Sequence, residues 1–269
     1  MDKNSIKNED QVLVDTSKSN ISEFAIYLKK RLLSPYFIVG ISILIFIITI
    51  SVNPQTFTPY SYAELNGVFP GSWEPPSPQH PLGTIKFGRD LLGRILYGIQ
   101  NSFYTASLGV LIALVGGLLI GIPMSFINQK LTISSERMLI LFYIYTLVIF
   151  PVLIIASIPS YNIFIIGILL IPIFAQIFAK TEFNLTEFTK KILIYAPLIF
   201  GFIILLYSFI GFLGFSDPTT INLGYEIQLS RVHVYDAPWG VIFPGIAVFI
   251  MIIGPFLLYA SLQKNPSTK

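Results

Sequence analysis

The stretch Phe103–Phe126, FYTASLGVLIALVGGLLIGIPMSF, decides the fold of this chain, because it contains no Asp, Glu, Lys or Arg. A helix needs about 20 predominantly apolar residues to cross the hydrocarbon core of a bilayer. The stretch meets that length without one charged side chain. It therefore predicts a transmembrane helix.

Five more segments lack all four charged residue types, and the chain as a whole is 54% hydrophobic and only 12% charged. Soluble domains carry about 25% charged residues. We therefore predict an all-α, polytopic membrane protein with a single transmembrane domain over residues 36–262. Its other predicted spans are Tyr36–Val52, Met138–Ile158, Asn162–Ala179, Ile192–Phe215 and Trp239–Leu262. The third and fourth spans are equally compatible with one re-entrant pair, so the count of six is the simplest one.

The basic residues predict the orientation of the spans. If the N-terminus is inside, only four of the 17 Lys and Arg residues fall in outer segments: Lys86, Arg89, Arg94 and Arg231. Basic residues gather on the cytoplasmic side of membrane proteins. Both termini, residues 1–35 and 263–269, are therefore expected in the cytoplasm of a protein of the plasma membrane. The substantial outer loops are then the proline-rich residues 53–102 and the shorter 216–238.

An amphipathic segment precedes the first span. Its apolar residues fall on one helical face: Ile21, Phe24, Ala25, Leu28 and Leu32. This pattern predicts an interfacial helix on the lipid bilayer. A plain cytoplasmic extension of the first span is the alternative.

The composition excludes several classes of function. The chain has no cysteine, and no catalytic motif or paired carboxylate occurs in a span, so we expect no enzyme, no metal site and no cofactor bound by this chain. No basic run resembles a nucleic-acid footprint. Ion-coupled carriers keep ionisable groups inside the membrane, and these spans have no acidic or basic side chain. If the chain moves a solute uphill, another subunit must supply the energy.

Two sets of residues in the spans are candidates for packing and for transport. The second span carries a stripe of small residues that allows close helix contact, either within this chain or with another subunit. The stripe consists of Gly109, Ala113, Gly117 and Gly121. Polar side chains that are candidates for lining a lumen, or equally for internal packing, are Tyr143, Thr146, Gln176, Tyr207 and Ser208.

One outer segment carries a specific pattern just before the second span. It reads His80-Pro-Leu-Gly-Thr84, then Gly88-Arg89-Asp90, Arg94, Tyr97-Gly98 and Ser102. This segment resembles the signature of dipeptide and oligopeptide ABC importer permeases, of the second permease type. Phe209–Phe215 and the stretch from Trp239 to Gly245 are similar to later parts of that family. The motif residues that we carry forward are His80, Gly83, Thr84, Gly88, Arg89, Asp90, Arg94, Tyr97 and Gly98.

The resemblance implies a fold like that of type I ABC importer permeases and a role as one half of a translocation pathway. The implied partners are a second permease, two ATP-binding subunits that would hold the ATP, and an extracytoplasmic solute-binding protein. The implied solutes are peptides or oligosaccharides.

The sequence also departs from the family. Ile85 stands where the family has aspartate, Gly93 where it has serine, and Gln100 where it has arginine. The family's ATPase-docking segment after the fourth span is degenerate or mostly deleted here. The candidate coupling residues that remain are Glu182, Asn184, Glu187, Lys190 and Lys191. A permease-derived subunit with an assembly or scaffolding role is therefore the second hypothesis.

Overall fold

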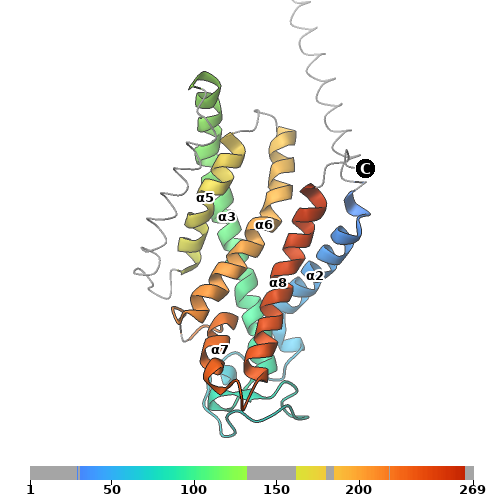
Figure 1. Cartoon of the computed structure of the whole chain (residues 1–269), viewed down its shortest axis with the longest axis vertical. Helices are drawn as coiled ribbons and strands as arrows, with labels where there is room; N and C mark the ends of the chain where they lie inside the picture. The colour runs from blue at the N-terminus through green and yellow to red at the C-terminus, as the bar shows by residue number, and fades with distance from the viewer. Residues whose placement is uncertain (1–28, 30, 132–161, 180–184, 218, 264–269) are drawn as a thin grey trace, which may run out of the picture.

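The helices are the main feature of the computed structural model, which describes residues 29, 31–131, 162–179, 185–217 and 219–263 (Figure 1). Within this part of the chain the bounds of the helices are α2 Pro35–Val52, α3 Leu91–Leu131, α5 Asn162–Ala179, α6 Leu185–Phe212, α7 Leu223–Ser230 and α8 Trp239–Gln263. A single hairpin joins strands β1 (Thr84–Ile85) and β2 (Arg89–Asp90). Short 3₁₀ turns lie at η1 Pro54–Thr56, η2 Glu64–Asn66, η3 Lys86–Gly88 and η5 Arg231–His233.

Four of the described helices are long and apolar enough to cross a membrane. They contain the segments Pro35–Val52, Leu91–Ser125, Thr186–Phe212 and Trp239–Gln263. The apolar part of α5, Ile166–Ala179, is shorter. The polytopic, mostly helical architecture thus agrees with the sequence. The third predicted span, Met138–Ile158, and the amphipathic residues Ile21, Phe24, Ala25 and Leu28 lie outside the described residues.

The helices lie side by side in the order α5, α3, α6, α8 and α2 (Figure 1). Contacts join α3 with α5 and α6, and they join α8 with both α6 and α2. The beginning of α2 and the end of α8 lie at the same end of the bundle, and the hairpin and α7 lie at the other (Figure 1). We call this second end, formed by residues 53–90 and 213–238, the loop end.

Glycines allow the helices to approach closely. A Cβ added to Gly40 of α2 would lie 3.0 Å from the Gly254 carbonyl oxygen of α8. A Cβ on Gly109 would lie 2.9 Å from Ile203 Cδ1 of α6. Side chains of ordinary size at these positions would separate the helices, which explains why small residues recur there.

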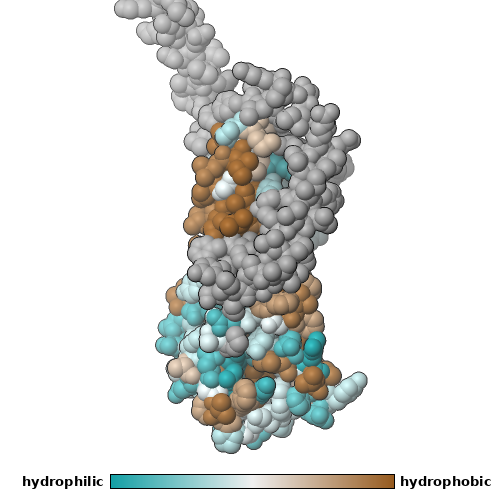
Figure 2. Space-filling view, turned by 90° about the vertical axis from the view of Figure 1, so that its left-hand side faces the viewer, coloured by the Kyte–Doolittle hydropathy of each residue, from teal (hydrophilic) through white to brown (hydrophobic). Residues whose placement is uncertain are grey.

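The outward sides of the long helices are apolar. Large exposed side chains include Ile45 and Phe46 on α2, Leu111 and Leu119 on α3, and Phe249 on α8. Figure 2 shows hydrophobic residues on the described helix surface in the upper half of the molecule, whereas the loop end is mostly hydrophilic. An apolar surface of this extent is suited to lipid or to partner helices rather than to water.

Helix α3 begins at Leu91, well before the charge-free stretch that starts at Phe103. The extra turns contain Arg94, which is 1% exposed and fully enclosed by the loop end. The sequence-based boundary is late because it was drawn where charged residues stop. A charged side chain can lie inside a helix bundle when its charge is paired, and Arg94 is paired with Glu226.

Candidate functional site

The resemblance motif folds into one interlocked unit at the loop end, and the hairpin is its centre. Strands β1 and β2 pair Thr84 with Asp90 and Ile85 with Arg89. The turn between them needs positive φ at Phe87 (68°) and at Gly88 (65°). A Cβ on Gly88 would also collide with the carbonyl oxygen of Pro70. Glycine is therefore required at this position by both the backbone conformation and the space.

Thr84 ties the hairpin to the preceding loop and to the start of α8. Its Oγ1 donates to the Gly71 carbonyl oxygen at 2.6 Å and accepts from the Glu74 amide at 2.8 Å. The indole Nε1 of Trp239 donates to the Thr84 carbonyl oxygen at 3.0 Å. Gly83 has φ 81°, and a Cβ there would lie 2.8 Å from the Trp239 Nε1. The motif's Gly-Thr pair is thus a packing junction between the hairpin and the last helix.

Asp90 links His80 to the beginning of α3. Its Oδ1 accepts from the Gly93 amide at 2.6 Å, so it caps the helix N-terminus. Its Oδ2 lies 3.0 Å from His80 Nδ1. Tyr60 stacks on the His80 ring with centroids 5.8 Å apart. Asp90 is 3% exposed, and both of its oxygens have partners, which makes it a structural carboxylate.

Arg89 holds the loop around η2 against the hairpin. Its Nε and a terminal nitrogen donate to the carbonyl oxygens of Gly67 and Asn66 at 2.8 and 2.9 Å. Its guanidinium also lies 4.9 Å from the centroid of the Phe87 ring, a cation–π arrangement. Burial, followed by the nearby charge of Arg94, lowers the pKa of Arg89 from its ordinary value.

Arg94 forms the deepest contact of the site. One terminal nitrogen donates to the Leu65 carbonyl oxygen at 2.6 Å, and the other donates to Glu226 Oε1 of α7. The Arg94 and Glu226 side chains are 1% and 0% exposed. An ion pair withdrawn from water to this degree makes each partner dependent on the other. It joins α3 and α7, which lie far apart in the sequence.

Tyr97 and Gly98 complete the contact between α3 and the second loop. The Tyr97 ring is buried and meets Tyr62 edge-on, with centroids 5.4 Å apart. A Cβ on Gly98 would lie 2.6 Å from Leu223 Cδ2, the first residue of α7. The motif's Tyr-Gly pair therefore shapes the surface on which the second loop rests.

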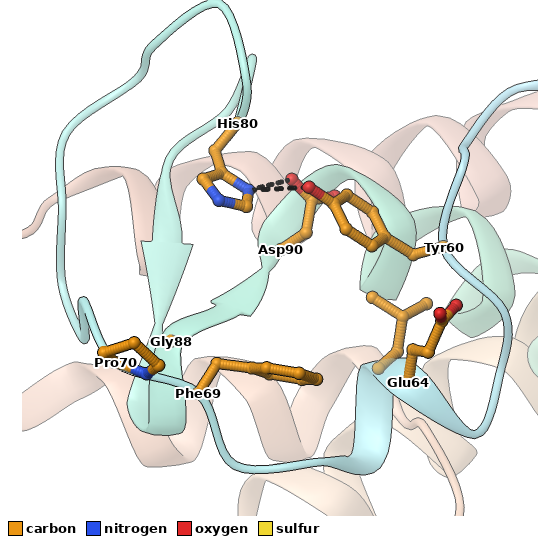
Figure 3. Close-up of a pocket in the computed structure, with 8 residues that line it drawn as sticks. Tyr60, Glu64, Phe69, Pro70, His80, Gly88 and Asp90 are labelled. Carbon is orange, nitrogen blue, oxygen red and sulfur yellow. Dashed lines mark hydrogen bonds and ion pairs between the residues drawn. The ribbon is translucent and has the colours of Figure 1, made fainter.

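A half-open pocket lies on the face of this unit (Figure 3). Its volume is about 340 Å³. Figure 3 shows the His80 ring beside Asp90, the Tyr60 hydroxyl beside the same carboxylate, and Phe69 below them. Three segments meet here: η2 with the loop after it, the residues before β1, and the hairpin. The lining residues are Tyr60, Glu64, Leu65, Phe69, Pro70, His80, Gly88 and Asp90.

The departures from the family fit their surroundings. Ile85 is 1% exposed and belongs to the hydrophobic core, where an unpaired aspartate would be costly. Gly93 approaches the Leu65 side chain of η2, so that a Cβ would lie 2.8 Å from Leu65 Cδ2. Gln100 donates to the Ser51 carbonyl oxygen near the end of α2 at 2.8 Å. Each substitution therefore has a local contact in this chain.

The small-residue stripe of α3 packs inside the chain. Gly117 and Gly121 face Phe174 and Phe178 of α5, and Gly109 faces Ile203 of α6. Ala113 is 0% exposed. Of the two interpretations of this stripe, internal packing is the one that the described helices display.

The remaining candidates are only partly described. Tyr207 and Ser208 are buried in α6, with 7% and 6% exposure, and Gln176 lies on α5 with partial burial. Tyr143, Thr146, Glu182 and Asn184 lie outside the described residues. Glu187, Lys190 and Lys191 occupy the first turns of α6, where Lys190 Nζ lies 3.5 Å from Glu187 Oε1. These turns lie at the end of the bundle opposite the motif (Figure 1).

Two residues of the site were not identified from the sequence. Glu226 is the acidic partner of Arg94, and Asn222 caps α7 by accepting from the Gly224 and Tyr225 amides at 2.8 and 3.2 Å. The cap had a local signal, because Asn before a helix accepts hydrogen bonds from its first turn. The ion pair had none, because its two residues come from different loops.

Comparison with known proteins places this geometry in a family. No family model matches the chain. The dipeptide transport system permease of Alkalihalophilus pseudofirmus is 27% identical over 256 residues, covering 84% of this chain and 83% of that protein. The dipeptide permease of Haemophilus influenzae is 25% identical over 286 residues, covering 91% and 93%. The probable D,D-dipeptide permease of Escherichia coli is 27% identical over 209 residues, covering 67% and 70%.

These relatives are transport permeases rather than enzymes, and the similarity runs through most of each chain. The apolar helices are those of a multi-pass membrane protein. The motif that first indicated the resemblance is also the best-ordered set of interactions at the loop end. The chain belongs to the ABC permease family that includes these peptide-transport permeases.

Proposed function

We propose that this chain is the permease subunit of an ATP-driven ABC importer for peptides and forms half of the translocation pathway. The observation that carries the proposal is the similarity to dipeptide permeases over most of both chains. The interlocked motif supports it, because Arg94, Asp90 and Thr84 connect three helices to the same loop unit. An oligosaccharide importer stays a prediction from the resemblance.

The proposed assembly contains a second permease, two ATP-binding subunits and an extracytoplasmic binding protein. In that assembly the ATP is bound and hydrolysed by the partner subunits, and this chain binds no cofactor. The charge-free spans support this division of labour, because a self-powered carrier needs ionisable groups within the membrane. The loop end would face the outside, and both chain ends would face the cytoplasm.

A permease-derived subunit with an assembly role is the second candidate. The degenerate coupling segment favours it, because an ATPase needs a rigid surface on which to act. The first turns of α6 carry Glu187, Lys190 and Lys191, and they offer such a surface beside the connection from α5. If that surface is used, the chain transports; if it is not, the chain only helps the complex to form.

The experiment is purification of the chain from its native membrane, followed by peptide uptake into vesicles that contain the purified complex. The proposal expects an ATPase and a second permease in stoichiometric amounts, and uptake that stops when ATP is withheld. Absence of every ATPase from the complex would sink the proposal.

A reversal of charge separates the two candidates. Lys190→Glu together with Lys191→Glu reverses the charge of the candidate docking surface on α6. A transporting subunit should lose peptide-stimulated ATP hydrolysis while the complex still assembles. An assembly subunit should retain uptake, because the surface then has no partner. Lys29→Glu, an exposed charge reversal on another element, is the matched control.

A further inference from the structure

The pocket at the loop end is acidic. It is lined by the carboxylates of Glu64 and Asp90, and none of its lining residues is Lys or Arg. Burial, followed by the charges of Asp90 and Glu64, raises the pKa of Tyr60, so both carboxylates act on the same hydroxyl. His80 pairs with Asp90 and offsets at most one of the two negative charges. The pocket therefore attracts a cation.

The pocket is also bordered by exposed apolar side chains. Phe69, which lines it, is 44% exposed, and the adjacent Val68 is 73% exposed. Both lie in the loop after η2 and not on the lipid-suited sides of the helices. Apolar side chains around a charged pocket on a water-facing loop are typical of protein–protein interfaces, in which aromatic residues are enriched.

The shape of the pocket favours a protein side chain over a free small molecule. Sites for small ligands usually bury 70–90% of the ligand surface. This pocket is built from surface loops and is open along one side, so an occupant enters from the water and stays partly exposed (Figure 3). A long basic side chain held by its own protein fits that geometry, with its aliphatic stem beside Phe69 and its charge near Glu64.

We propose that this acidic pocket receives a Lys or Arg side chain of the extracytoplasmic binding protein when that protein docks on the loop end. The inference rests on the proposed function, which supplies the docking protein. Glu64 is the recognition residue: its Oε2 accepts only from the Ser61 amide, at 2.6 Å, and its side chain is exposed. Asp90 is a positioning residue, because its oxygens already hold His80 and the first turn of α3.

The test measures the affinity of the binding protein for the full complex in lipid nanodiscs. Glu64→Gln keeps the acceptor for Ser61 but removes the charge, so we expect affinity to fall about threefold, with a smaller loss at high salt. Glu64→Lys places a like charge against the incoming side chain and should lower affinity by roughly tenfold or more. Asp236→Asn removes an exposed carboxylate elsewhere at the loop end and is the matched control, which should bind like wild type.

A charge exchange identifies the partner residue. A binding-protein variant in which one basic residue of the docking face is changed to Glu should bind the Glu64→Lys complex better than the wild-type complex. Wild-type affinity for both Glu64 variants would overturn the inference and leave the proposed function intact. Failure of the binding protein to bind even the wild-type complex would instead overturn the proposed function.

A second measurement tests whether the pocket binds a transported amine instead. Uptake of a dipeptide is compared with uptake of its N-acetylated form in wild type and in Glu64→Gln. If the substitution impairs only the free amine while binding-protein affinity is unchanged, the pocket takes the solute's ammonium group and the docking inference is wrong. An equal effect on both peptides, with reduced affinity for the binding protein, supports docking.

Discussion

The ion pair between Arg94 and Glu226 is the residue-level contact on which the loop end most depends. Removing one partner of a buried pair leaves an uncompensated charge and costs about 3–5 kcal/mol. We therefore expect Arg94→Met to lower the free energy of unfolding by that amount. Both tryptophans of the chain, Trp73 and Trp239, lie at the loop end, so their fluorescence during a denaturant titration in detergent reports this region.

The double variant Arg94→Met, Glu226→Leu is the control for this prediction. It removes both charges and keeps apolar volume at both positions, so it should recover most of the lost stability. A double variant as unstable as Arg94→Met alone would show that the packing of the arginine matters more than its charge.

Gly88 gives a second prediction at the same scale. Gly88→Ala places a methyl group at a φ of 65° and against the Pro70 carbonyl oxygen, so it should destabilise the chain by more than about 1 kcal/mol. Gly245→Ala is the matched control, since a Cβ there meets nothing within 4 Å. The same fluorescence titration measures both. Equal stabilities of the two variants would contradict the close approach of the hairpin to Pro70.

Sequence reasoning found half of this residue network. The spacing of the motif identified Arg94, but Glu226 did not stand out, because the loop 216–238 also contains Asp217 and Asp236. The partner is selected by the register of α7, which places Glu226 on the buried side of the helix. Such a choice depends on the packing of two loops and leaves no local pattern in either of them.

Among the elements, the contact between α3 and α5 depends on glycine. A Cβ on Gly117 would collide with the Cβ of Phe174, and both atoms lie too close to their backbones to move away. We expect Gly117→Ala to cost about 1–3 kcal/mol of stability, as overpacking of a tight interface does. Ser107→Ala, on an exposed position of the same helix, should change stability little.

Limited proteolysis and the denaturant titration measure this effect together. Faster cleavage in the connection between α3 and α5 is expected for Gly117→Ala alone. If instead the variant is stable but fails to associate with its partner permease, the stripe is a subunit interface and the internal packing is secondary.

The charge-free stretches predicted which segments are helical, but not how far each helix extends. For α3 they placed the start at Phe103, whereas the helix begins at Leu91, after the cap formed by Asp90. A count of charged residues cannot recognise an arginine whose charge is neutralised by a distant glutamate. Helix boundaries near the loop end were therefore predictable only where no such pair exists, as at Pro35, where proline at the first helical position marks the start of α2.

For the whole molecule, the sequence predicted that both termini lie on one side. The structure is compatible with this, since α2 begins and α8 ends at the same end of the bundle (Figure 1). It was not predictable that the two loops, 53–90 and 213–238, interlock into one unit. That arrangement follows from contacts such as Trp239 with Thr84, which join residues more than a hundred positions apart.

The orientation of the whole molecule in the membrane is the last prediction, and the absence of cysteine makes it directly testable. Tyr235 is 95% exposed at the loop end, and Gln263 is exposed at the opposite end of α8. Because most basic residues lie toward the Gln263 end, that end should face the cytoplasm. A membrane-impermeant maleimide added to intact cells should label Tyr235→Cys within minutes and should label Gln263→Cys only after the membrane is opened. The unsubstituted chain, which has no thiol, sets the background. Labelling of Gln263→Cys in intact cells, with Tyr235→Cys protected, would invert the molecule and place the acidic pocket out of reach of any extracytoplasmic protein.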